Sequence, residues 1–124
     1  MQWIKQAFSV LLGEQAEQLA KQYLEKQGLI FVTQNYRCRS GEIDLIMRHQ
    51  NTLVFVEVKF RSRTDFGQSV EYFHASKRRK FESAIAHYLH QNKLNPSNLD
   101  LRIDIIGLDS SPQGQTKYTW LQNV

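Results

Sequence analysis

Residues 53–61 carry an alternating pattern that few structures other than a sheet strand can accommodate. They read Leu-Val-Phe-Val-Glu-Val-Lys-Phe-Arg, a run rich in β-branched and aromatic residues. Because side chains alternate across a strand, one face is entirely apolar and consists of Val54, Val56, Val58 and Phe60. The other face carries three charges and consists of Phe55, Glu57, Lys59 and Arg61. We therefore expect this segment to be a strand buried in a sheet, with its charged side chains on one face.

A second strand, from about Glu42 to Arg48, precedes this one and is separated from it by polar turn residues at 49–52. A two-residue loop at 50–51 and a four-residue loop at 49–52 give the same hairpin pairing, with Asp44 opposite Glu57. Directly paired residues have Cβ atoms about 4.5–5.5 Å apart, and like charges there are destabilising. Either the register differs or a cation lies between the two acids, and we adopt the second interpretation.

Two carboxylates in a core segment need a partner, because an unpaired buried charge is very costly. Magnesium binds oxygen ligands and needs only one or two carboxylates plus a substrate phosphate. The predicted metal site, for Mg²⁺ or Mn²⁺, uses Asp44, Glu57 and the carbonyl of Val58. Lys59 lies on the same face as Glu57, about 7 Å further along, where its ammonium can orient or deprotonate an attacking water or neutralise a phosphate. The simpler alternative is a Glu57–Lys59 salt bridge at a strand end, with Asp44 capping a turn.

A helix over residues 13–27 supplies a third acid. Its apolar stripe has the spacing of an amphipathic helix and comprises Ala16, Leu19, Ala20, Tyr23 and Leu24. At about 100° per residue, Glu17 projects about 20° from Leu24, at the edge of this stripe, whereas Glu14 points further towards solvent. Glu17 is thus the acid that can reach a site over the sheet, and the alternative is a boundary residue paired with Lys21.

Five blocks of sequence resemble the YraN-like family of small bacterial proteins. They are Gly13-x-x-x-Glu17-x-x-Ala20-x-x-Tyr23-Leu24, Asn35-Tyr36-Arg37, Gly41-Glu42-Ile43-Asp44-Leu45-Ile46, Phe55-Val56-Glu57-Val58-Lys59-x-Arg61 and Arg102-Ile103-Asp104. That family is similar to the PD-(D/E)XK, restriction-endonuclease-like superfamily and, within it, to the archaeal Holliday junction resolvases. By position, the resemblance implies that Glu17 is the helix acid, Asp44 the metal-binding aspartate, Glu57 the second acid and Lys59 the catalytic lysine. The resolvases act as dimers, so a homodimer is an expectation for which the sequence identifies no surface.

The remaining pattern predicts one restriction-endonuclease-like α/β domain over residues 1–124. We expect a mixed sheet of about five strands flanked by helices, in the order α-β-β-β-α-β-β. The other expected segments are a strand at 30–36, a loop beside the site at 62–73, a helix at 76–91, a turn at 95–98 and strands at 101–108 and 117–121. The buried stripe of the second helix is predicted to be Phe81, Ala84, Ile85, Tyr88 and Leu89. Asp104 is interpreted as structural, paired with an arginine.

Positive charge is concentrated around the candidate site. Between positions 37 and 80 there are ten Lys/Arg and five Asp/Glu, whereas the rest of the chain has six and seven. Such residues give nucleic acids a sequence-independent affinity, and the candidates are Arg37, Arg39, Arg61, Arg63, Lys77, Arg78, Arg79 and Lys80. The alternative for the run at 77–80 is the solvated first turn of a helix.

Cys38 is the single cysteine, which excludes an internal disulfide and agrees with a reducing cytoplasm. No segment is long and apolar enough for a membrane span, so no membrane partner is expected.

Three functions remain as hypotheses. The leading one is a Mg²⁺-dependent endonuclease that hydrolyses phosphodiester bonds in DNA, with branched or repair intermediates as candidate substrates. The alternative is a non-catalytic nucleic-acid-binding protein that keeps a nuclease fold. A third is a small structural subunit whose first residues, through Trp3, Phe8 and Leu11, dock on a larger partner.

Overall fold

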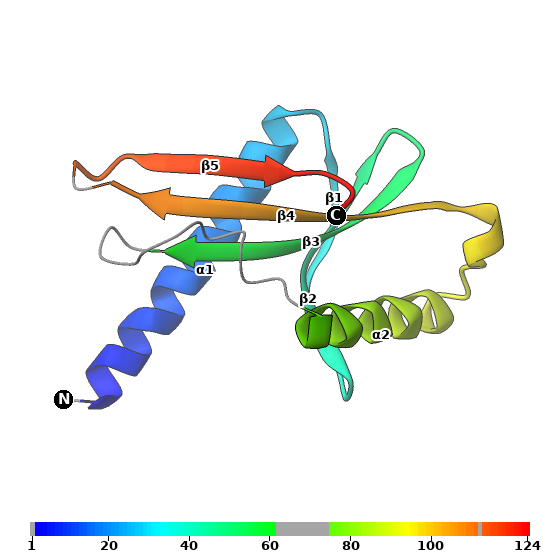
Figure 1. Ribbon diagram of the computed structural model, residues 1–124, viewed down its shortest axis with the longest axis horizontal. Helices are drawn as coiled ribbons and strands as arrows, with labels where there is room; N and C mark the ends of the chain where they lie inside the picture. Colours follow the sequence, from blue (N-terminus) through cyan, green and yellow to red (C-terminus); the bar gives the residue numbers. More distant parts are fainter. Residues whose placement is uncertain (1, 62–74, 112) are drawn as a thin grey trace.

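The computed structural model describes residues 2–61, 75–111 and 113–124, which form a mixed five-stranded sheet with a helix on each face (Figure 1). The elements are α1 (Gln2–Lys26), β1 (Ile30–Cys38), β2 (Gly41–His49), β3 (Thr52–Arg61), α2 (Ala75–Gln91), a 3₁₀ turn (Pro96–Asn98), β4 (Asp100–Ser110) and β5 (Thr116–Leu121). The predicted order α-β-β-β-α-β-β is confirmed. The loop expected at 62–73 lies outside the described residues.

The strands follow one another across the sheet in chain order, β1-β2-β3-β4-β5. All neighbours are antiparallel except β3 and β4, which are parallel and are joined by a crossover that contains α2. The predicted hairpin register is confirmed, because Arg48 pairs with Leu53 and His49 with Thr52. The loop is therefore the two-residue alternative, and Gln50 turns it with a φ of 57°.

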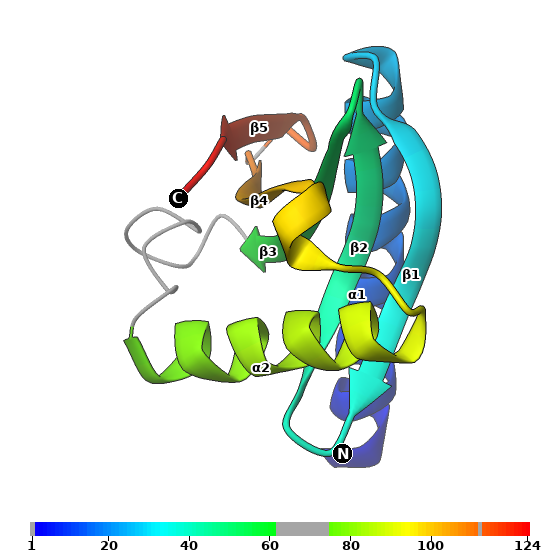
Figure 2. The same ribbon diagram turned by 90° about the vertical axis from the view of Figure 1, so that its right-hand side faces the viewer.

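Two hydrophobic cores lie on opposite faces of the sheet, one under each helix (Figure 2). The α1 core contains Ala16, Ala20 and Leu24 of the helix against Val54 and Val56 of β3. The α2 core contains Phe55 of β3 and the predicted stripe of α2, namely Phe81, Ala84, Ile85, Tyr88 and Leu89. The predicted alternation of β3 is thus confirmed in its apolar residues.

The first helix differs from the expectation in two respects. It begins at Gln2 rather than at Gly13, and its N-terminal end extends away from the sheet (Figure 1). A glycine inside a helix costs only about 0.5–1 kcal/mol relative to alanine, so Gly13 does not end it. In addition, Leu19 was expected in the buried stripe but is 38% exposed. The sheet covers the row Ala16-Ala20-Leu24, spaced four residues apart, and Leu19 lies beside that row.

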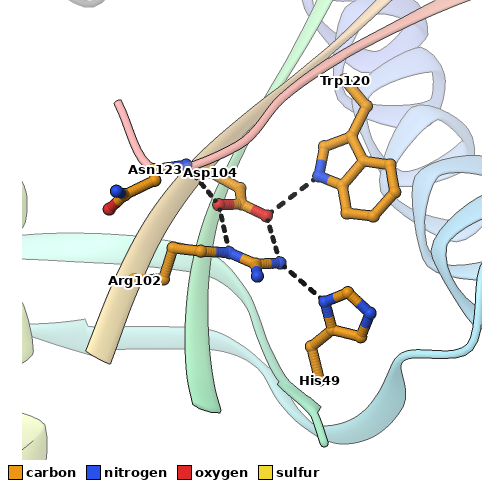
Figure 3. A network of polar contacts seen from close by, with 5 residues as sticks. All are labelled: His49, Arg102, Asp104, Trp120 and Asn123. Atoms are coloured by element: carbon orange, nitrogen blue, oxygen red, sulfur yellow. Dashed lines mark hydrogen bonds and ion pairs between the residues drawn. The ribbon is translucent and has the colours of Figure 1, made fainter. Parts of the chain in front are cut away.

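Asp104 is fully buried at the centre of a polar network that joins β4 to its neighbours (Figure 3). Its Oδ1 accepts hydrogen bonds from Arg102 Nε and from the backbone N–H of Asn123, both at 2.9 Å. Its Oδ2 accepts from Arg102 Nη2 at 3.0 Å and from Trp120 Nε1 at 2.9 Å. Arg102 Nη2 also lies 3.1 Å from Nδ1 of His49. The predicted pairing of Asp104 with an arginine is confirmed.

Candidate metal and nucleic-acid site

The candidate site lies where β2 and β3 separate. Their ladder ends at the pair Leu45–Val56, whereas β3 stays paired with β4 as far as Arg61 and Asp109. Beyond Val56 the edge of β3 therefore faces a gap, and the side chain of Asp44 fills it. Asp44 Oδ2 accepts a hydrogen bond from the backbone N–H of Val58 at 2.8 Å. The N–H and C=O of one strand residue point to the same side, so we expect the Val58 carbonyl to open towards the same gap.

The second carboxylate of the gap is Glu57, which is only 8% exposed. Continuation of the hairpin register places it opposite Asp44. Burial raises the pKa of Asp44 to about 8, with repulsion from Glu57 as the next cause; the Val58 N–H acts in the opposite direction. An acid with this pKa holds a proton at neutral pH unless a cation takes the proton's place. The predicted approach of the two acids is therefore present in the structure.

Two lysines interact with this pair of acids. Lys77, in the first turn of α2, places Nζ 2.6 Å from Glu57 Oε1. Burial alone would lower the pKa of Lys77, but its hydrogen bond to Glu57 and the charges of Glu57 and Asp44 leave it raised. Lys59 has a lowered pKa, caused first by burial and then by Lys77, while the two acids act in the opposite direction. The structure thus gives Glu57 a partner, Lys77, that the salt-bridge alternative did not predict.

Glu17 is half-buried on α1, as predicted, and is bound from the sheet. The side-chain amide of Asn35, with its nitrogen facing the acid, donates to Glu17 Oε1 at 2.9 Å and to Oε2 at 3.2 Å. Burial raises the pKa of Glu17, and the Asn35 hydrogen bond opposes that rise. The charge of Glu17 in turn contributes to the raised pKa of Asp44. The alternative partner, Lys21, instead lies 4.1 Å from the centre of the Phe31 ring.

The donor set of the gap suits magnesium. Within the described residues, no three or more His, Cys, Asp and Glu side chains are arranged to hold a metal ion. The available oxygens are those of Asp44, Glu57 and the Val58 carbonyl. Magnesium commonly uses one or two carboxylates and keeps several waters, so this set is sufficient. Such an ion would supply Lewis-acid activation of a phosphodiester and its attacking water when bound.

The predicted basic residues fall into two groups. Arg37, Arg39 and Lys80 are exposed and line a hollow of about 370 Å³ at the turn between β1 and β2. Arg37 Nε lies 3.3 Å from Glu42 Oε2 there.

The other five candidates form the second group, and two of them make ion pairs with acids of the protein. Lys77 points to Glu57, and Arg78 Nε lies 3.7 Å from Glu82 Oε2. Arg79 is exposed. The side chain of Arg61 and the whole of residue 63 lie outside the described part of the chain.

Sequence reasoning missed two residues of this site. Asn35 has a left-handed φ of 53° inside β1, between the pairs Gln34–Leu45 and Tyr36–Ile43, which places it beside Asp44. Asparagine tolerates this conformation better than most residues, so an asparagine within a strand pattern was an available signal. Lys77 was assigned to nucleic acid alone, because no local pattern connects it to a strand residue twenty positions earlier.

Fold and site together define a small mixed α/β protein in which acids and lysines gather where two strands of the sheet separate. Within that class, the chain belongs to the uncharacterised protein family UPF0102, whose family model matches residues 16–108. A UPF0102 protein of Colwellia psychrerythraea is 46% identical over 111 residues, which cover 90% of this chain and 85% of that protein. One from Shewanella denitrificans is 44% identical over 110 residues, covering 89% and 94%. The segment matched by the family model, residues 16–108, includes all the residues of the candidate site.

Proposed function

We propose that this protein is a magnesium-dependent endonuclease that hydrolyses phosphodiester bonds in DNA. The observation that carries the proposal is the position of Asp44, whose carboxylate fills the gap between β2 and β3 beside Glu57. Two acids lie where β2 and β3 separate, and Lys59 follows Glu57 by two residues. This pattern matches the site implied by the resemblance, through the YraN-like family, to the PD-(D/E)XK nucleases. Branched or repair intermediates are candidate substrates.

Each residue has a distinct role in this proposal. Asp44, Glu57 and the Val58 carbonyl hold the metal. Lys59 has a lowered pKa, which brings its amine closer to the range in which it can accept a proton from the attacking water. Glu17, held by Asn35, acts on the site through its charge on Asp44.

The test compares cleavage of labelled branched, single-stranded and duplex DNA with Mg²⁺ or Mn²⁺. We expect wild type to cleave at least one of these. Asp44→Ala removes a metal ligand and Lys59→Ala removes a catalytic acid–base group, so each should lose about 10²-fold or more in rate. Asp100→Ala, which removes an exposed acid of β4, is the matched control and keeps its rate. Cleavage that survives both substitutions would refute the mechanism.

A second candidate function is binding of nucleic acid without cleavage. It is favoured by the ion pair between Glu57 and Lys77, which satisfies the acid without a metal. It is also favoured by the basic hollow lined by Arg37, Arg39 and Lys80. This function needs no divalent ion, so a nucleic-acid affinity unchanged by Mg²⁺ and an absence of cleavage would favour it over the nuclease.

A further inference from the structure

We infer that Lys77 is a built-in competitor for the metal: its ammonium occupies Glu57 in the metal-free protein and must leave when a divalent cation binds. This inference rests on the proposed metal site. It concerns a residue of α2 that the resemblance to known nucleases does not assign to the metal site, and it starts from the 2.6 Å contact between Lys77 Nζ and Glu57 Oε1.

The two buried acids of the described sheet are neutralised in different ways. Asp104 receives hydrogen bonds from Arg102, from the Trp120 ring and from a backbone N–H, groups fixed by the strands around it (Figure 3). Glu57 is instead held by a lysine on a different element, at the start of a helix. A lysine has a flexible four-carbon stem, so its ammonium can withdraw by side-chain rotation without any movement of the sheet.

The exposure of the pair is consistent with such a withdrawal. The side chain of Glu57 is 10% exposed, whereas that of Lys77 is 34% exposed. The acid is thus largely enclosed by the protein, whereas the side chain of the lysine that contacts it is partly open to solvent.

The ammonium and a divalent ion compete for this acid. Magnesium lies about 2.0–2.1 Å from its oxygen ligands, so it would stand within a few ångströms of Nζ if Lys77 stayed. The site already carries Lys59, which interacts directly with Lys77. A third and doubly charged cation among these groups would be repelled strongly. Departure of Lys77 removes that repulsion and exposes a Glu57 oxygen.

The experiment measures Mn²⁺ affinity by titration calorimetry, without nucleic acid, for wild type, Lys77→Gln, Lys77→Arg and Arg79→Gln. Loss of the competing ammonium should make Lys77→Gln bind Mn²⁺ about tenfold more tightly. Lys77→Arg should bind it more weakly than wild type, because a guanidinium grips a carboxylate with two hydrogen bonds. Arg79→Gln removes an equal charge from the same helical turn and should stay within about twofold of wild type.

Thermal unfolding provides a second readout that needs no activity. Without metal, Lys77→Gln should have a lower Tm than wild type, because Glu57 is left buried without its cation. Saturating Mn²⁺ should raise the Tm of Lys77→Gln more than that of wild type. If Lys77→Gln does not fold without metal, Lys77→Arg carries the affinity test.

The possible outcomes separate this inference from the proposed function. Mn²⁺ binding that Lys77→Gln leaves unchanged or weakens, or that Arg79→Gln strengthens equally, would overturn the competition alone. If neither wild type nor Lys77→Gln binds millimolar Mn²⁺, the proposed metal site fails and the competition with it. Tighter binding in Lys77→Gln, reversed in Lys77→Arg, supports both.

Discussion

Two aspartates in the same sheet, on strands that flank β3, show how one residue type can be structural or functional. Asp104 in β4 is fully buried, and both of its oxygens accept bonds from fixed donors. Asp44 in β2 accepts from one backbone N–H and faces a second acid, and its pKa is raised to about 8. Strongly perturbed acids of the second kind are typical of functional sites, although structural ion pairs also produce them. The unfavourable proximity of Asp44 and Glu57 is what a cation would relieve.

Asp44 should make the stability of the metal-free protein fall as the pH rises. Its pKa is about 8 in the folded chain, against an ordinary value of 3.8 for an aspartate. Between about pH 4 and pH 8 the folded state therefore holds a proton that the unfolded state has released, and the free energy of unfolding decreases with pH, by at most about 1.4 kcal/mol per unit. Asp44→Asn removes the titrating carboxyl. As the pH rises from about 4 to 8, the free energy of unfolding of this variant should therefore increase relative to that of wild type. Urea unfolding at several pH values with a chelator present measures the difference.

Asp100→Asn is the control for that series, because it removes an exposed aspartate from the same sheet. It should follow the wild-type pH dependence. Added Mg²⁺ should flatten the wild-type curve at the alkaline end, since the ionised form of Asp44 gains a partner. Parallel curves for wild type and Asp44→Asn would show that Asp44 does not titrate in this range.

At the scale of elements, the turn between β1 and β2 packs against the backbone of α2. A Cβ added to Gly41 would lie 2.6 Å from the carbonyl oxygen of Lys80, closer than the two atoms can approach. This contact fixes the start of α2 beside the sheet and, with it, the turn that carries Lys77. We expect Gly41→Ala to lower the free energy of unfolding by about 1–3 kcal/mol, the usual cost of overpacking.

Gly13→Ala is the matched comparison and should have the opposite effect. A Cβ at Gly13 would meet no atom within 4 Å, and the residue lies inside α1. Replacement of a helical glycine by alanine typically stabilises by about 0.5–1 kcal/mol. Urea unfolding of both variants checks the two signs, and a Gly41→Ala protein as stable as wild type would show that α2 can move away freely.

The elements that sequence reasoning located correctly were those whose own periodicity defines them. The five buried positions of α2, from Phe81 to Leu89, follow from helical spacing alone. The register of Arg48 with Leu53 follows from the short polar turn. Extrapolated beyond the last ladder pair, Leu45–Val56, it places Asp44 opposite Glu57. Both inferences need only residues close together in the chain, where the geometry of a helix or a hairpin is fixed.

The features that were missed depend on packing between elements distant in the chain. Leu19 has the correct helical spacing, but the sheet covers the adjacent row Ala16-Ala20-Leu24, so Leu19 is exposed. The contacts of Glu57 with Lys77 and of Asp104 with Trp120 join different elements, and no repeat or spacing encodes them. The early start of α1 was missed because Gly13 was interpreted as a boundary, although one glycine is too weak to end a helix.

At the scale of the whole molecule, the positive charge is asymmetric. The exposed Arg39 and Lys80 come from opposite ends of the 37–80 segment, and the fold places them around one hollow at the β1–β2 turn. Acids and lysines of the candidate site occupy the adjoining strands β2 and β3 and the first turn of α2. In the described part of the chain, no helix is long and apolar enough to cross a membrane. The proposed function requires such a basic surface to hold a phosphate backbone over the metal.

The salt dependence of nucleic-acid binding tests this arrangement independently of cleavage. Each phosphate neutralised by a basic side chain adds about one to the slope of log K against log salt concentration. Arg39→Gln and Lys80→Gln should therefore each weaken binding of a duplex and reduce that slope by about one, measured by fluorescence anisotropy with a chelator present. Lys26→Gln, which removes an exposed lysine from the last turn of α1, should leave the slope unchanged. Equal slopes in all three variants would place the nucleic-acid surface elsewhere on the molecule, because a cation that contacts no phosphate releases no counterion when the complex forms.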